Sequence, residues 1–254
     1  MAGSRNKTLG LEFRGAIFLF KIYHKHYKLS LIHILMSFES FLEQQDGIYE
    51  SFKAFIKSDK GVVPKSHRQG AYMIAFRHSD EITNKIMDFS NKVSKLVRSI
   101  KYDKSNAHTT IIIFQAKDDF VCDTKMLERL SEVVEGCLPL LERVVVDYDC
   151  WLLNQDAGVA AGKPNSAFYG VVEQIVNQAS KKGMEFRLPW GAHITVARFL
   201  ESKSKDEIKE LIQLFKTELP IGKSKPVSID VGYLNFSSDD FKYFVFKSFN
   251  LSNS

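Results

Sequence analysis

The sequence has 254 residues, of which 44% are apolar and 26% charged, with only 14 glycines and 6 prolines. This length allows one large or two small domains with a buried core, and the composition excludes disordered, collagen-like and low-complexity proteins. The net charge of +5 suits an anionic ligand, and three cysteines without C-x-x-C spacing favour a soluble protein of the reducing cytoplasm over a disulfide framework or a zinc knuckle.

The N-terminal third gives the weakest signals. No stretch of eighteen uncharged apolar residues occurs, and the nearest approach, residues 15–36, is interrupted by lysines and histidines, so we expect no transmembrane span. Residues 1–35 have two open interpretations: a basic amphipathic surface segment, or an appendage or upstream translation artefact ahead of a compact domain that begins at Met36. Residues 36–70 are expected to form a helical or loop extension.

From Ala71 onward the spacing of apolar residues is regular, and segments with the spacing of a strand alternate with segments that have the spacing of a helix. The expected elements of a first half are a strand over 71–77, a helix over 82–97, a strand over 109–115, a helix after residue 123 and a strand over 143–153. The order then repeats. A second half is expected to contain a short strand or loop over 156–162, a helix over 168–179, a strand over 192–200, a helix over 208–215 behind a Ser204/Glu207 capping box, and a hairpin of strands 226–236 and 241–251.

A histidine-x-threonine motif opens a strand at the same place in each half. The two copies are His108-Thr109-Thr110 and His193-Ile194-Thr195. Because side chains alternate across a strand, the histidine and threonine of each copy share one face. Histidine titrates near neutrality, so one ring can accept a proton while the other donates one. Two such strands side by side would surround a small anion with two imidazoles and two hydroxyls, which suits phosphodiester cleavage without a metal.

The surroundings of these motifs resemble the two-histidine (2H) phosphoesterase superfamily, which includes bacterial 2′-5′ RNA ligase-like proteins and cyclic nucleotide phosphodiesterases. The second motif, within residues 191–199, is similar to the family's form except that Ala192 stands where a proline is common. The first motif, within residues 107–114, lacks the usual leucine after the threonine, and residues 241–246 are similar to the family's closing aromatic strand. The resemblance covers roughly residues 71–251 and leaves residues 1–70 outside it.

This resemblance implies an α+β domain over residues 71–254, with two pseudo-symmetric halves of about 71–155 and 156–251, antiparallel sheets forming a central cleft, and helices outside. It also implies a phosphodiesterase, without metal or cofactor, that cleaves a 2′,3′-cyclic phosphate or a 2′-5′ phosphodiester of RNA or a small cyclic nucleotide. His108 and His193 would act as general acid and base, in either order, while Thr110 and Thr195 hold the phosphate oxygens. A non-catalytic nucleotide- or RNA-binding module, and a 2′-5′ RNA ligase running the reverse reaction, stay open as alternatives.

Other residues are weaker candidates. The aromatic rings of Trp190 and Tyr243 are candidates for stacking on a base. Arg198 would suit a phosphate, but strict alternation places it on the face opposite His193. The stretch around Gly158 and Gly162 is expected to connect the two halves. The expected partner is RNA or a small cyclic nucleotide as substrate; the oligomeric state is left open, with a monomer favoured.

Overall fold

The structure, a computed structural model, describes residues 36–64, 69–138, 143–184, 186 and 188–251. Both interpretations of residues 1–35 therefore lie outside the described residues. Within the described ranges, no helix is both long enough and apolar enough to cross a membrane.

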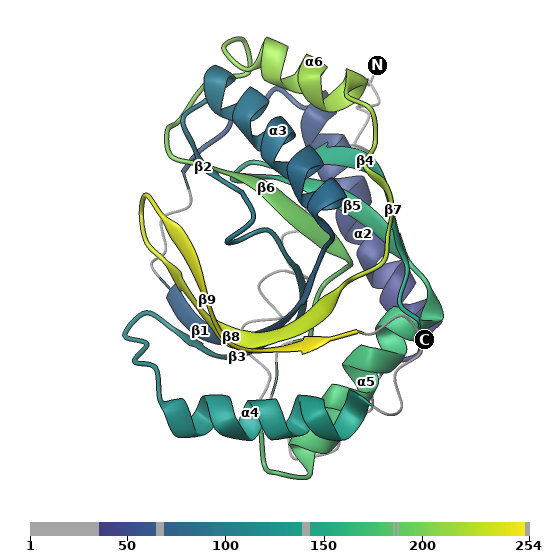
Figure 1. The fold of residues 1–254 in the computed structure, drawn as a ribbon. Helices are drawn as coiled ribbons and strands as arrows, with labels where there is room; N and C mark the ends of the chain where they lie inside the picture. The colour runs from purple at the N-terminus through teal and green to yellow at the C-terminus, as the bar shows by residue number, and fades with distance from the viewer. Residues whose placement is uncertain (1–35, 65–68, 139–142, 185, 187, 252–254) are drawn as a thin grey trace, which may run out of the picture. The chain divides into compact units, whose positions relative to one another are not determined.

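Five helices and nine strands make up the described part of the chain (Figure 1). The helices are α2 (Phe38–Lys57), α3 (Asp80–Leu96), α4 (Thr124–Cys137), α5 (Ser166–Ser180) and α6 (Lys209–Thr217). The strands are β1 (Gln69–Arg77), β2 (Ser99–Lys101), β3 (Thr109–Lys117), β4 (Val146–Leu153), β5 (Ala157–Pro164), β6 (His193–Phe199), β7 (Gly222–Ser224), β8 (Ser228–Phe236) and β9 (Phe241–Asn250). The expected α+β class with antiparallel strands is confirmed, and the two three-residue strands β2 and β7 were not predicted.

The sheet consists of two arms joined by one residue pair. Its order is β7-β4-β5-β6-β3-β1-β8-β9, with every neighbouring pair antiparallel and β2 added to β6. The pair that joins β3 to β6 is Thr109 opposite Ile194. The two histidine-x-threonine motifs therefore meet where the two arms of the sheet meet.

The two arms are not the two predicted halves of the sequence. Each half contributes the order strand, helix, strand, helix, strand, as expected, but two strands of each half lie in the other arm: β2 and β4 from the first half, and β8 and β9 from the second. β4, from the first half, pairs with β5, whereas β8, from the second half, pairs with β1. The boundary near residue 155 thus divides the sequence repeat but does not divide the sheet.

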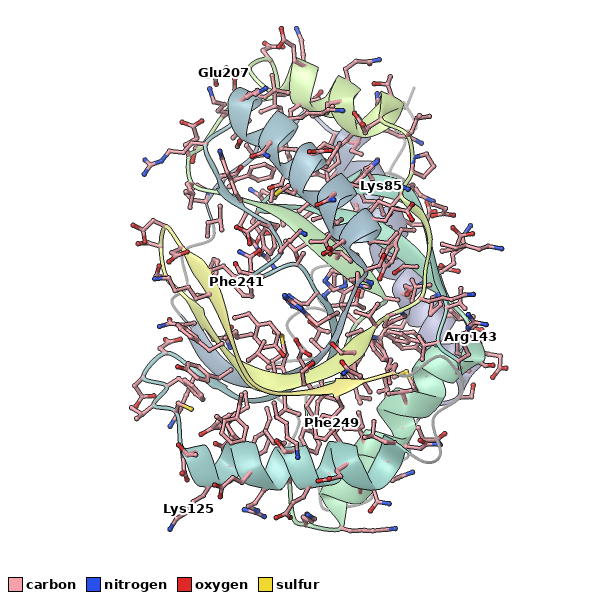
Figure 2. All side chains as sticks on the ribbon, viewed as in Figure 1. Lys85, Lys125, Arg143, Glu207, Phe241 and Phe249 are labelled. Carbon is pink, nitrogen blue, oxygen red and sulfur yellow. The ribbon has the colours of Figure 1, made fainter. Side chains whose placement is uncertain are left out.

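The helices cover each arm by burying an apolar stripe. α3 contacts β6 and α6, and the Phe89 ring of α3 stacks on Trp151 of β4 at a centroid distance of 3.8 Å. On the other arm, α4 packs against α5, β8 and β9. Figure 2 shows the side chains that fill the space between α4 and these strands, where the labelled Phe249 lies. The helices thus bury one face of each arm in the core.

The stretch 156–162 was expected to be a short strand or loop, and the strand alternative holds: the interior strand β5 occupies residues 157–164 and is more than a connection between halves. Its glycines are there because neighbouring side chains come close. A Cβ at Gly158 would lie 2.4 Å from the Phe215 ring, and one at Gly162 would lie 2.4 Å from Val146 Cγ1. The glycines therefore permit close packing within the sheet.

Candidate active site

The Thr109–Ile194 pair determines how the two motifs face each other. In an antiparallel pair, the residues on either side of a matched pair are also neighbours, so His108 lies beside Thr195, and Thr110 lies beside His193. All four side chains lie on the face opposite the matched pair, because side chains alternate. The structure thus brings together the four residues predicted from the motifs.

Each motif is followed at once by a β-bulge. In β3, the register passes from Thr110 to Ile112, which leaves Ile111 as an extra residue. In β6, it passes from Thr195 to Ala197, which leaves Val196 as an extra residue. Bulges bend a strand and redirect its side chains. The pseudo-symmetry of the site therefore includes the backbone irregularity as well as the motif.

The bulge in β6 corrects the prediction for Arg198. One extra residue reverses the alternation, so Arg198 lies on the same face as His193 and Thr195. Its side chain is 24% exposed, its Nη1 lies 3.8 Å from Asp156 Oδ1, and it forms a side-chain hydrogen bond with Tyr102. Arg198 is therefore a member of the site.

Both imidazoles are held in the same tautomer. His108 Nδ1 lies 2.7 Å from the carbonyl oxygen of Asn106, and His193 Nδ1 lies 3.0 Å from that of Gly191. A carbonyl oxygen can only accept a hydrogen bond, so each Nδ1 carries the proton and donates it. In the neutral ring, Nε2 is consequently the unprotonated nitrogen, ready to accept a proton from a substrate.

Burial keeps both rings neutral. It lowers the pKa of His108 to about 4 and that of His193 to about 3, because the charged form loses its solvation. The hydrogen bonds to Asn106 and Gly191 oppose this shift, whereas the Arg198 charge adds to it for both rings. In the ligand-free protein near pH 7, both histidines are therefore bases, and neither carries the proton that a general acid needs.

The two threonines differ in their surroundings. Thr195 is buried and forms a side-chain hydrogen bond with Tyr102. Thr110 is only half-buried, and its hydroxyl lies 3.8 Å from the sulfur of Met73, a weak acceptor. Thr110 can thus turn its hydroxyl toward a ligand at little cost, whereas Thr195 belongs to a hydrogen-bonded group that includes Tyr102 and Arg198.

The turn before β3 holds His108 in place. Asn106, which supplies the carbonyl to His108, donates from its own side chain to the carbonyls of Lys101 and Phe241 at 3.2 and 3.3 Å. Arg77 donates to the Ala107 carbonyl at 2.9 Å. The Phe241 ring lies nearly parallel to the His108 ring, with 5.8 Å between centroids. This support comes from the turn itself, from strands β1 and β9 of the same arm, and from Lys101 of β2, which pairs with β6.

The aromatic candidates for base stacking have other partners. The Trp190 ring lies 3.7 Å from the His193 ring, nearly parallel to it, so one of its faces is covered by the histidine. Tyr243 is only 7% exposed, donates its hydroxyl to the Asp230 carbonyl at 3.0 Å, and packs against His108. A buried ring cannot serve as an open stacking platform, so the prediction for Tyr243 is wrong, and Trp190 orients a histidine.

A buried polar group on the other face of the sheet was missed by the sequence reasoning. Thr109 Oγ1 lies 2.6 Å from the Tyr148 hydroxyl and 3.0 Å from His78 Nε2, and His78 Nδ1 lies 2.8 Å from Ser224 Oγ. Burial lowers the pKa of His78 to about 3, which keeps it neutral. These contacts connect the junction of the two arms to β4 and β7.

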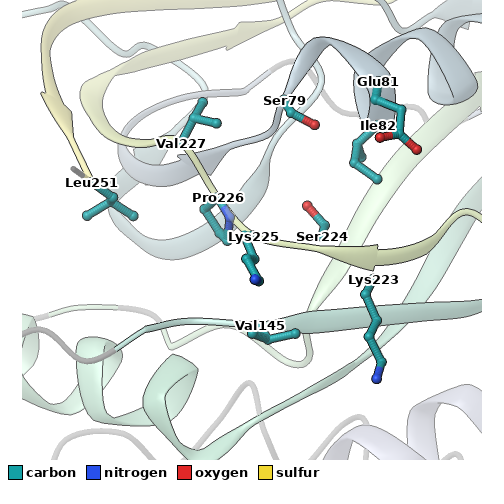
Figure 3. Close-up of a pocket in the computed structure, with 10 residues that line it drawn as sticks. All are labelled: Ser79, Glu81, Ile82, Val145, Lys223, Ser224, Lys225, Pro226, Val227 and Leu251. Carbon is teal, nitrogen blue, oxygen red and sulfur yellow. The ribbon is translucent and has the colours of Figure 1, made fainter. Parts of the chain in front are cut away.

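A pocket in the described part of the chain is lined by neither histidine of the pair. Its volume is about 470 Å³, and it is lined by Ser79, Glu81, Ile82, Val145, residues 223–227 and Leu251 (Figure 3). Ser224 is the one member of the buried polar group among these lining residues. Across the described residues, no group of three or more His, Cys, Asp or Glu side chains is placed to hold a metal ion.

Comparison with solved structures places this geometry on a known fold. Escherichia coli LigT, solved in complex with 3′-AMP, superposes with a TM-score of 0.50 and 15% sequence identity, over 73% of this chain and 99% of LigT. The chain has the LigT fold. The protein TT0787 of Thermus thermophilus matches with a TM-score of 0.50 and 12% identity, over 71% of this chain and 97% of TT0787. No family model matches the chain, and no curated protein matches it in sequence. The LigT fold confirms the fold implied by the resemblance to 2H phosphoesterases.

Proposed function

We propose that this protein is a phosphodiesterase that cleaves a 2′,3′-cyclic phosphate or a 2′-5′ phosphodiester by acid–base catalysis with His108 and His193. The observation that carries the proposal is the antiparallel pairing of Thr109 with Ile194, which sets both motifs on one face of the sheet. His108, Thr110, His193, Thr195 and Arg198 then share one face, which offers two imidazoles, two hydroxyls and a guanidinium to a ligand. This set offers proton transfer and anion binding together.

The reaction divides between the two rings. One imidazole Nε2 removes a proton from the attacking water or ribose hydroxyl as its oxygen bonds to phosphorus. The other ring, protonated, gives its Nε2 proton to the ribose oxygen as the bond between that oxygen and phosphorus breaks. Thr110, Thr195 and Arg198 hold the non-bridging oxygens, on which negative charge builds up.

The second ring must gain its proton when the substrate binds. Both rings are neutral in the free protein near pH 7, since their pKa values are lowered to about 4 and about 3. A bound phosphate anion raises both pKa values because it stabilises the imidazolium form. One histidine therefore takes up a proton when the substrate binds and becomes the general acid. The negative charge of the substrate phosphate is what makes this protonation favourable.

A nucleotide ligand suits this site for a second reason. The LigT structure that superposes at a TM-score of 0.50 contains 3′-AMP. A ribose phosphate offers both the anion for the guanidinium and the hydroxyl for the base. Because both motifs lie on one chain, the proposed site is complete in a monomer. The cytoplasmic location is a separate prediction, which comes from the sequence.

The test is turnover of a panel of 2′,3′-cyclic nucleotides, 2′-5′ oligoadenylate and cyclic dinucleotides, with and without EDTA. We expect at least one substrate to be hydrolysed at a rate that EDTA leaves unchanged. Loss of activity in EDTA, restored by one divalent ion, would contradict the mechanism. Tight binding without turnover would indicate the binding module instead, and joining of RNA ends through a 2′-5′ linkage would indicate the ligase.

A further inference from the structure

Helix α2 lies outside the region of resemblance, yet it reaches the loop that carries His193. It packs along β4 (Figure 1), and two of its buried polar side chains, Gln45 and Tyr49, project to the backbone just before the second motif. Gln45 Oε1 accepts the Ala192 N–H at 2.8 Å. Tyr49 donates its hydroxyl to the Ala192 carbonyl at 2.8 Å and accepts the Gly162 N–H at 3.1 Å. Both peptide groups of Ala192 are therefore held by α2.

The same loop fixes the ring of His193. Gly191, directly before Ala192, supplies the carbonyl that accepts the His193 Nδ1 proton at 3.0 Å. A Cβ at Gly191 would lie 2.8 Å from Gln45 Cγ, so the loop and the helix are in direct contact at this residue. A shift of Gly191 would move the acceptor that sets the tautomer of His193.

A second line of contacts runs through Trp190. Tyr49 meets the Trp190 ring edge-on at 5.9 Å, and Phe52 packs against it at 5.8 Å. Trp190 in turn lies parallel to the His193 ring at 3.7 Å. The helix thus contacts both groups that orient the His193 imidazole: the Gly191 carbonyl, which accepts its Nδ1 proton, and the Trp190 ring, which covers its face.

The Gln45 side chain makes its hydrogen bond to Ala192 while the other end of its amide is buried without a partner among the described residues. Gln45 is fully buried, and its Nε2 has no hydrogen-bond partner among the described residues. A buried donor without a partner is unfavourable, so an apolar side chain of the same shape would be preferred if packing were all that mattered. The role of glutamine here is therefore its Oε1, which accepts the Ala192 N–H.

We propose that Gln45 and Tyr49 of α2 are positioning residues, which hold the Gly191–Ala192 backbone so that His193 presents an unprotonated Nε2 to the substrate. This inference rests on the proposed function for its kinetic consequence, but its structural claim concerns the ring of His193 alone. Burial raises the pKa of Tyr49 well above its usual value, so the phenol stays protonated and keeps donating. The groups that shift the pKa of His193 are the Gly191 carbonyl, Arg198 and His108.

The experiment measures the tautomer of His193 by ¹H–¹⁵N NMR of the full chain labelled at histidine, with the signal assigned from His193→Gln. Wild type is expected to show the proton on Nδ1. Tyr49→Phe removes the donor to Ala192, and Gln45→Met removes the acceptor at nearly constant shape. Each is expected to give a mixture of tautomers and to lower kcat by roughly ten- to a hundred-fold with little change in KM, since a small misplacement of a catalytic group is that costly.

Phe41→Leu is the matched control. Phe41 is as deeply buried on α2 but packs on Phe168 and Tyr169 of α5. It should lower the unfolding temperature while the His193 tautomer and kcat stay as in wild type. A wild-type tautomer in both test variants would overturn the proposal, as would a tautomer change that appears only with loss of the folded state. If the wild-type chain cleaves no phosphodiester, the proposed function fails, and the NMR result still decides the positioning role.

Discussion

The two histidines occupy equivalent positions but are supported in different ways. His108 is held by the turn before β3, through Asn106, and by Arg77 of β1, which donates to the Ala107 carbonyl. His193 is held by helix α2 and by a tryptophan that covers its ring. What the two have in common is the Nδ1–H donated to a carbonyl, the neighbouring threonine and the bulge that follows. The shared features are those that acid–base chemistry on a phosphate requires, whereas the supports are free to differ.

The charges around the two motifs are also unequal. Arg198, five residues after His193, faces the site, whereas the corresponding residue after His108 is Ile113. The first motif is instead close to Arg77, whose charge lowers the pKa of His108 and whose Nε lies 3.4 Å from Asp230 Oδ2. Arg77 is thus neutralised by a buried carboxylate and by backbone carbonyls, which leaves Arg198 as the better partner for a phosphate.

The largest expected effect comes from removing either imidazole. His108→Ala and His193→Ala should each lower kcat by on the order of 10²–10⁴, the usual contribution of a general acid or base. Circular dichroism and the unfolding temperature of each variant serve as the control for folding. Near-full turnover by either variant would show that the two motifs are not functionally equivalent and would contradict the two-histidine mechanism.

A smaller loss of activity is expected from replacing Arg198, whose counterpart after the first motif is Ile113. Arg198→Met removes the guanidinium, and because a hydrogen bond to a charged group contributes about 1.5–3 kcal/mol, kcat/KM should fall roughly ten- to a hundred-fold. Arg129→Met is the matched control, since Arg129 lies on α4 and donates to the Lys182 carbonyl away from the site. Equal kinetics in the two variants would place Arg198 outside the phosphate site.

Acid stability tests the buried histidine of the opposite face, which contributes alongside the catalytic pair because burial lowers all three pKa values. The pKa of His78 is lowered to about 3, from 6.5 when unfolded, so the unfolded chain binds the proton more readily below pH 6.5. The contribution of His78 to the free energy of unfolding is therefore fully present above pH 6.5 and is lost as the pH falls toward 3. At pH 5, this one group should cost about 2 kcal/mol of unfolding free energy relative to pH 7.

His78→Gln tests this contribution, because glutamine can still form hydrogen bonds in the buried group but does not titrate. Urea unfolding at pH 7 and pH 5 should show a loss on acidification about 2 kcal/mol smaller in the variant than in wild type. The rate of turnover is not the readout here, since His78 faces away from the substrate. An identical loss in both proteins would mean that the pKa of His78 is the same in the folded and the unfolded chain, and would contradict its lowering by burial.

The sequence predicted the motif residues because alternation and helical spacing are local properties. His108, Thr110, His193 and Thr195 share a face in the structure as alternation requires. The misplacement of Arg198 had a different origin. A bulge arises from how two strands match along their length, and Val196 carries no signal of it in a single sequence. A rule of strict alternation therefore fails at the residue where the site gains its charge.

Long-range contacts account for the other misses. Gln45 and Tyr49 meet Ala192 across 147 and 143 residues of sequence, and nothing in a helical pattern indicates which loop its polar side chains will reach. Strands β2 and β7 have three residues each, too few to show a period. The crossing of β2, β4, β8 and β9 between the arms is a property of the topology, which local periodicity does not determine.

The smallest expected effects distinguish the two threonines. Thr110→Val and Thr195→Val keep the shape and delete the hydroxyl, so each should lower kcat/KM by up to about ten-fold through one lost hydrogen bond to the phosphate. Thr195→Val should also lower the unfolding temperature, because it removes a partner of the buried Tyr102, whereas Thr110 gives up only a contact with the Met73 sulfur. The pH dependence of kcat should survive in both variants, since proton transfer stays with the histidines. Unchanged kinetics in one variant would make that threonine structural and would leave the phosphate held from a single arm of the sheet.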